Sequence, residues 1–254
     1  MSLTSVLYCI KIQVLNMSAL PDFEKIHPSL WRGSQLARTA GRVVDTGYER
    51  LSAELPGGGW PLSALVELLT SGSGIGELRI LRPALASLAQ RPIALIQPPQ
   101  VPNMHAFAYL GIDPSKLLWI SPKKTADSLW AAEQILRAGS FGAVLFWQQH
   151  IRGESLRRLS LAAQSDETLF VLLRPLARAQ DSSPASLRLA LRPAENGVEV
   201  EVVKRKGPIG NGSFVVPVSP APSLVSPFAR RSRRLLVREA DTSVMVTPAD
   251  VSAP

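Results

Sequence analysis

The stretch LVELLTSGSGIGELRI, residues 65–80, decides how the rest of the chain is interpreted. Its apolar start at 65–69 predicts a short buried strand, and the amphipathic pattern that begins at Glu77 predicts a helix over 77–90. The loop between them contains three glycines, Gly72, Gly74 and Gly76. A strand, a glycine-rich loop and a helix in this order are typical of a phosphate-binding loop, whose successive backbone N–H groups converge on an anion.

The loop lacks the side chains that a working phosphate-binding loop needs. Such a loop carries a lysine that neutralises the phosphates and a serine or threonine that ligates magnesium. Residues 75–78, Ile-Gly-Glu-Leu, stand where that pair is needed. The Glu77 carboxylate would repel a phosphate by roughly 4 kcal/mol at ~4 Å and an effective dielectric of ~20. A plain turn and a degenerate phosphate loop therefore lead to the same prediction, that the loop does not bind ATP tightly.

The alternation of strand and helix continues on the C-terminal side of this unit. Apolar runs predict strands over 92–97, 117–121, 143–147 and 168–173, and amphipathic stretches predict helices over 104–110, 125–138 and 153–164. This pattern predicts an α/β fold with a mostly parallel, buried central sheet flanked by helices. Runs at 187–192 and 198–204 alternate with period two around Asn196-Gly197, which predicts a C-terminal β-hairpin.

The predicted domain covers residues 46–217. An irregular polar segment at 17–45 precedes it, and a flexible tail rich in arginine and proline at 218–254 follows it. Within the domain, a helix is expected at 49–55 and a turn or loop at 56–61, PGGGWP. Residues 1–16 are apolar but lack the basic start and the cleavage site of a signal peptide. They are interpreted as a mis-annotated extension, with the chain beginning at Met17.

The composition limits the classes of function. With 254 residues, 46% apolar and 19% charged, the chain is not fully disordered. No apolar stretch approaches the ~18 residues that span a bilayer, so an integral membrane protein is not expected. One cysteine, Cys9, and three scattered histidines predict neither an internal disulfide nor a metal site, and favour the cytoplasm. The net charge of +8 fits an anionic partner or the arginine usage of a GC-rich genome, and both interpretations stay open.

The motifs around the glycine loop resemble the ATPase core of the RecA recombinase. The resemblance covers roughly residues 45–208 and is carried by TGY at 46–48, LPGGGWP at 55–61, LGID at 110–113, LRRL at 156–159 and VVKRK at 202–206. The stretch HPSLWRG at 27–33, taken with LPGGGWP, is similar to the ImuA family. Members of that family are RecA-like accessory proteins of a bacterial translesion mutasome, so the resemblance implies a RecA-like core.

The departures from RecA concern its ATPase residues. The positions of its phosphate-binding lysine and threonine fall on Gly76 and Glu77. Its catalytic glutamate falls near Pro99, and its magnesium-linked aspartate near Trp147. ATP hydrolysis needs a carboxylate base and a metal-linked carboxylate. The resemblance therefore implies a pseudo-ATPase that binds partners without a cofactor, although a residual ATPase stays open as an alternative.

The resemblance implies a non-catalytic adaptor of the SOS response that acts in translesion DNA synthesis. Its expected partners are the Y-family-like subunit ImuB, RecA, the replicative polymerase paralogue of the mutasome, and DNA bound without sequence preference. The alternative is a SulA-type inhibitor of cell division that binds FtsZ. Residues 8–13, YCIKIQ, can be encoded by a DNA stretch similar to the operator of the SOS repressor, which fits SOS regulation.

Several side chains are candidates for partner or DNA binding. The resemblance to RecA implies that Lys204 and Lys206 reach a neighbouring protomer or its nucleotide, and a solvated strand end is the alternative. Trp31 and Trp60 lie in predicted loops and are candidate interface residues, as is Arg32. The other tryptophans, Trp119, Trp130 and Trp147, are expected in the core.

The tail carries the remaining candidates for partner binding. They form a basic cluster around a short apolar run: Arg230, Arg231, Arg233, Arg234, Leu235, Leu236 and Arg238. The apolar residues would dock on a protein partner as a short helix, and the arginines would hold DNA phosphates with a steep salt dependence. A tail that only improves solubility is the third interpretation.

Overall fold

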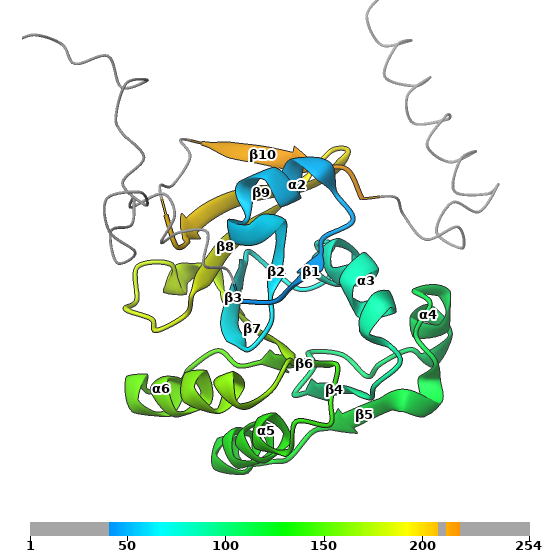
Figure 1. Ribbon diagram of the computed structural model, residues 1–254, viewed down its shortest axis with the longest axis vertical. Helices are drawn as coiled ribbons and strands as arrows, with labels where there is room; N and C mark the ends of the chain where they lie inside the picture. Colours follow the sequence, from blue (N-terminus) through cyan, green and yellow to red (C-terminus); the bar gives the residue numbers. More distant parts are fainter. Residues whose placement is uncertain (1–40, 208–211, 219–254) are drawn as a thin grey trace, which may run out of the picture. The chain divides into compact units, whose positions relative to one another are not determined.

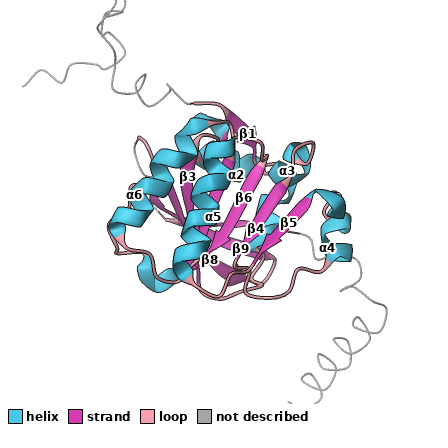
Figure 2. Ribbon diagram, turned by 90° about the horizontal axis from the view of Figure 1, so that it is seen from below, coloured by secondary structure: helices cyan, strands magenta, loops and turns pink. Residues whose placement is uncertain are grey.

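An eight-stranded, mostly parallel sheet with helices on both faces forms the core of the protein (Figures 1 and 2), as the computed structural model of residues 41–207 and 212–218 shows. The predicted α/β class is confirmed. In sheet order, the strands are β10 (Ser213–Val216), β9 (Gly197–Lys204), β8 (Leu187–Ala194), β3 (Ala64–Thr70), β7 (Leu169–Pro175), β6 (Ala143–Trp147), β4 (Ile93–Ile96) and β5 (Leu117–Ile120).

The strands from β8 to β5 are parallel, and β9 and β10 continue the sheet in antiparallel pairing. Parallel strands are covered on both faces, so they consist of continuous apolar runs. Accordingly, every residue of β4 and nearly every residue of β7 is buried. The predicted hairpin at Asn196-Gly197 joins β8 to β9.

Two apolar layers hold the helices against the sheet. One face carries α2 (Glu49–Glu54), α3 (Glu77–Leu88) and α4 (Met104–Tyr109), and the other carries α5 (Thr125–Ala138) and α6 (Gly153–Ala162). Figure 2 shows α5 and α6 side by side over the second face. Within the part of the chain that the structure describes, no helix is both long and apolar enough to cross a membrane.

The predictions for residues 43–45 and 59–61 were wrong, because these residues form two short strands. β1 (Val43–Asp45) lies in the segment predicted to be irregular, and it pairs antiparallel with β2 (Gly59–Pro61), where a turn or loop was predicted. Only residues 56–58 form the turn. Three-residue strands are too short to show a period of two, so the sequence pattern did not reveal them.

A third strand was also missed. β10 pairs with β9, so the predicted hairpin is extended to three antiparallel strands. Phe214 and Val216 face the apolar layer that contains α3, while Ser213 and Val215 are exposed. The other boundaries agree with the predictions to within about two residues, and α5 and β6 agree exactly with the predicted 125–138 and 143–147.

Candidate functional site

The glycine loop joins β3 to α3 at the carboxyl end of the sheet. Gly74 and Gly76 have φ angles of +78° and +113°, which side chains other than glycine rarely adopt. A Cβ atom on Gly76 would lie 2.7 Å from Cγ2 of Val198 in β9. The loop therefore needs glycine at position 76 both for its backbone conformation and for its close approach to β9.

The side chain of Glu77 folds back onto the backbone of this loop. Its Oε1 accepts a hydrogen bond from the N–H of Gly74 at 2.9 Å, and its Oε2 accepts one from the N–H of Gly76 at 3.1 Å. Glu77 is only 6% exposed and is the first residue of α3, where the helix dipole favours a negative charge. The N–H groups that would converge on a phosphate are therefore already bound to a carboxylate of the same chain.

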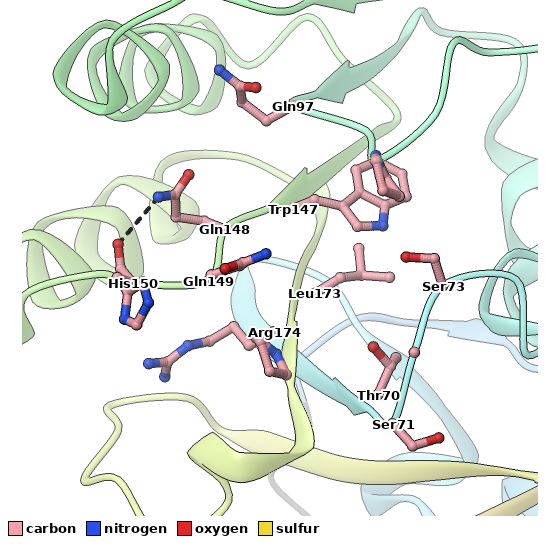
Figure 3. A pocket seen from close by; sticks show the side chains of 13 residues that line it. Thr70, Ser71, Ser73, Gln97, Trp147, Gln148, Gln149, His150, Leu173 and Arg174 are labelled. Carbon is pink, nitrogen blue, oxygen red and sulfur yellow. Dashed lines mark hydrogen bonds between the residues drawn. The ribbon is translucent and has the colours of Figure 1, made fainter.

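A cavity of about 530 Å³ lies beside the loop, at the carboxyl ends of β3, β4, β6 and β7 (Figure 3). This is the sheet edge at which open α/β proteins bind ligands. Hydroxyl groups line one side of it and amides and an imidazole the other, with Trp147 and Leu173 between them. The polar lining residues include Thr70, Ser71, Ser73, Gln97, Gln148, Gln149 and His150.

None of the described residues that line this cavity is acidic. Pro99 and Trp147, which the resemblance to RecA places near the positions of its two carboxylates, both line it. Within the described ranges, no three His, Cys, Asp or Glu side chains come together as a potential metal site. Apart from Arg174, which pairs with Asp181, the polar side chains of the lining are hydroxyls, amides and an imidazole, so its chemistry favours binding of a polar group over proton abstraction by a carboxylate.

Two polar contacts shape the rim of the cavity. The Gln148 amide donates to the carbonyl oxygen of His150 at 3.2 Å, and Nδ1 of His150 lies 2.5 Å from Nη2 of Arg178. Gln97 has a φ of +54°, which is uncommon for a residue with a side chain. Its side-chain nitrogen donates to the carbonyl of Pro122 and, at 3.1 Å, to the hydroxyl of Ser128, which holds this turn in place.

A buried charge cluster fastens the connection between β7 and β8, residues 176–186, to the sheet. Glu67, in the middle of β3, accepts hydrogen bonds from Nε of Arg188 at 2.8 Å and from the hydroxyl of Ser183 at 2.5 Å. The guanidinium group of Arg188 also donates to three carbonyl groups of the connection, those of Arg178, Ala179 and Asp181. Sequence reasoning missed this cluster, although a glutamate inside the apolar run LVELL was a visible signal.

Arg174 completes the cluster at the cavity wall. Its Nη2 donates to Oδ2 of Asp181 at 3.2 Å, and its Nη1 lies 3.6 Å from Oε1 of Glu67. The Nε and Nη1 atoms of Arg174 are buried and have no hydrogen-bond partner among the described residues. Because these atoms are buried, they are not available to a ligand in the cavity.

The predicted interface residues have different surroundings. Nζ of Lys204 donates to the carbonyl of Ser183 at 2.7 Å, so this lysine also secures the β7–β8 connection, while Lys206 is exposed. Trp60 was expected in a loop as a candidate interface residue, but it is fully buried in β2 and belongs to the core. The remaining candidates lie outside the described residues: Trp31, Arg32, Arg230, Arg231, Arg233, Arg234, Leu235, Leu236 and Arg238.

The expectation that the other tryptophans are core residues is wrong for two of them. Trp119 is 46% exposed on β5, which is the edge strand of the sheet, and Trp130 is 64% exposed on α5. Trp147 is partly buried and packs against the core. An edge strand and the outer face of a helix leave large side chains in solvent, and the residue types alone did not indicate which tryptophans these would be.

No model of a known protein family matches this chain, and no curated protein shows significant similarity to it.

Proposed function

We propose that this protein is a non-catalytic, RecA-like accessory protein of SOS-induced translesion DNA synthesis, which links RecA or damaged DNA to the Y-family-like subunit ImuB. The similarity of residues 27–33 and 55–61 to the ImuA family supports the assignment to this process. The parallel sheet with helices on both faces is consistent with a RecA-like core. The proposed mechanism is recruitment, because a binding module needs surfaces and not a reaction centre.

The observation that carries the non-catalytic part is the position of the Glu77 carboxylate. A nucleoside triphosphate would have to displace it from the N–H groups of Gly74 and Gly76. It would then meet a loop without the lysine that neutralises phosphates and a cavity whose described lining has no carboxylate for a base or for magnesium. These three features together disfavour tight ATP binding and hydrolysis.

The partner-binding part rests on the sequence motifs and on charge. The net charge of +8 suits acidic protein faces and DNA, and the exposed Lys206 and the arginine-rich tail are the basic candidates for these contacts. The replicative polymerase paralogue of the mutasome is a further proposed partner. Partner binding through the tail is favoured over nonspecific DNA binding because an apolar pair, Leu235-Leu236, lies within the arginine cluster.

The test is co-purification from DNA-damaged cells of the full chain carrying a C-terminal tag, alongside a companion that lacks residues 218–254. Capture of the Y-family-like subunit or of RecA supports the adaptor, and loss of the former on truncation assigns the tail. Capture of FtsZ with neither of these partners would overturn the proposal in favour of a division inhibitor. Release of phosphate from ATP above background by the purified protein would contradict the non-catalytic part.

A further inference from the structure

The outer faces of α5 and α6 carry two large apolar side chains that the fold does not use. Trp130 on α5 is 64% exposed and Leu161 on α6 is 66% exposed. The buried residues of these helices, which include Leu136 and Leu159, pack toward the sheet. Trp130 and Leu161 therefore point into solvent, where polar residues would serve folding equally well. Tryptophan is among the residue types that are enriched at protein interfaces.

A buried carboxylate arranges two arginines next to these apolar residues. Oε1 of Glu133 lies 2.7 Å from Nη2 of Arg137 on the same helix, and Oε2 of Glu133 accepts a hydrogen bond from Arg158 on α6. Glu133 is buried, whereas the side chains of both arginines are 62% exposed. One acid between the two helices thus holds two guanidinium groups at the surface, and two positive charges share one negative charge.

Helical spacing places these groups on one surface. Trp130, Gln134 and Arg137 follow one another at intervals of one turn on α5, and on α6 Leu161 lies one turn after the adjacent Arg157 and Arg158. Both helices return across the same face of a parallel sheet, so they run in the same direction. We call this surface the α5–α6 face, and its members are Trp130, Gln134, Arg137, Arg157, Arg158 and Leu161.

We propose that the α5–α6 face docks an acidic, amphipathic protein segment of the Y-family-like subunit, an inference that rests on the proposed function. An acidic side chain of that segment pairs with Arg137 and Arg158, and a neighbouring apolar side chain packs on Trp130. Glu133 is a positioning residue, because it fixes the arginines before the partner arrives and so lowers the ordering cost of binding.

The charge pattern favours a protein segment over nucleic acid. Asp127 and Glu154 are exposed in the first turns of α5 and α6. A nucleic-acid backbone carries a negative charge at every phosphate, so it would meet these two carboxylates as well as the arginines. A protein segment can place acidic residues opposite the arginines only, and apolar residues opposite Trp130 and Leu161.

The test measures binding of the purified full chain to the purified Y-family-like subunit by calorimetry. Trp130→Ala and the double variant Arg137→Glu/Arg158→Glu are each expected to weaken binding by about tenfold or more. Two matched controls make the same kinds of substitution outside the α5–α6 face. Trp119→Ala removes an exposed tryptophan from the edge strand, and Lys123→Glu/Lys124→Glu makes an equal change of charge at exposed lysines. Both controls are expected to bind within about twofold of the unmodified chain.

A further variant tests the role of Glu133. Glu133→Gln is expected to weaken binding, because the arginines lose their fixed positions, and to increase its salt dependence, because the face gains one net positive charge. Thermal unfolding of each variant separates a binding defect from misfolding. If a variant unfolds at the assay temperature, Trp130→Ser and Arg158→Gln at the exposed positions replace it.

The outcomes separate this inference from the proposed function. If the unmodified chain binds the subunit and all variants bind equally well, the docking face is wrong and the adaptor stands. If the unmodified chain binds neither the subunit nor RecA, the proposed function is wrong, and this inference fails with it. If Arg137→Glu/Arg158→Glu weakens binding of a single-stranded oligothymidylate but leaves subunit binding unchanged, the face binds nucleic acid and the inference is overturned.

Discussion

At the scale of single residues, Glu77 is the side chain that most changes the interpretation of the glycine loop. The sequence indicated a carboxylate near the phosphate position, and repulsion was the expected consequence. In the structure, the same carboxylate accepts hydrogen bonds from the backbone N–H groups of Gly74 and Gly76. A carboxylate of the same chain therefore satisfies two N–H groups of the loop.

Glu77→Ala is expected to leave these N–H groups without a partner and to lower the free energy of unfolding by about 1–3 kcal/mol in a buffer without oxyanions. Added sulfate or phosphate is then expected to raise the melting temperature of this variant more than that of the unmodified chain, because the anion takes the vacated place. Differential scanning fluorimetry measures both. Glu154→Ala, an exposed acid in the first turn of α6, is the control. An equal response of all three proteins would contradict the prediction.

Tyr48 is expected to make the stability of the folded protein depend on pH in the alkaline range. Its hydroxyl donates to the carbonyl of Arg79 at 3.1 Å, and burial raises the pKa of this tyrosine above its usual value, while the positive charge of Arg82 lowers it. A raised pKa means that the folded state retains the proton more strongly than the unfolded state. The resulting stability is fully present below the usual tyrosine pKa and is lost as the pH rises through the folded pKa.

Urea unfolding at a series of alkaline pH values tests this. The free energy of unfolding is expected to fall more steeply above about pH 10 in the unmodified chain than in Tyr48→Phe. At neutral pH, the variant is expected to lose about 0.5–1.5 kcal/mol with the hydrogen bond. Parallel curves for the two proteins at alkaline pH would show that Tyr48 does not contribute to the pH dependence.

At the scale of elements, the pairing of β1 with β2 depends on a close backbone approach. A Cβ atom on Gly59 would lie 2.4 Å from the carbonyl oxygen of Val44. The φ angle of Gly59 is extended, so the requirement for glycine comes from space and not from backbone conformation. The same pairing holds Trp60 in the core.

Gly59→Ala is therefore expected to lower the free energy of unfolding by about 1–3 kcal/mol, because one of the two strands must move. Gly72→Ala is the matched control, since a Cβ at position 72 meets no atom within 4 Å. We expect the control to stay within about 0.5 kcal/mol of the unmodified chain. Equal losses in the two variants, measured by urea unfolding, would contradict the role assigned to Gly59.

At the scale of the whole molecule, the Glu67–Arg188 pair joins residues 121 positions apart and ties the β7–β8 connection to the centre of the sheet. Both side chains are buried. Removing one partner from such a pair leaves an uncompensated charge in the interior, which costs more than replacing both partners by apolar groups.

Arg188→Met is expected to lower the free energy of unfolding by about 3–5 kcal/mol, whereas Glu67→Leu/Arg188→Met is expected to lose less than the sum of the two single variants. The partly exposed pair of Arg192 and Glu201, with an N–O distance of 2.9 Å, provides the comparison. Arg192→Met is expected to cost about 1 kcal/mol or less. Additive losses at Glu67 and Arg188 in urea unfolding would show that the two side chains do not act as a pair.

Much of this fold was predictable from the sequence because its main elements carry local patterns. Continuous apolar runs identify the buried parallel strands, and 3.6-residue periodicity identifies α3, α5 and α6. Asn196-Gly197 identifies the hairpin because few other residue pairs accept its turn conformation. The glycine loop was predictable for the same reason, as its residue types and spacing are local to one segment.

The site and the surfaces were predictable only in part. The sequence by itself determined the fold class and the position of the glycine loop. It also determined that residues 75–78 lack the lysine and the hydroxyl residue that a working phosphate-binding loop carries. Only the tertiary structure decided that Glu77 fills its own loop, that Trp60 is buried and Trp130 exposed, and that Glu67 and Glu133 each pair with an arginine from a distant segment. The physical reason is that strand and helix patterns arise from neighbours along the chain, whereas burial and ion pairing depend on which distant segments meet in space.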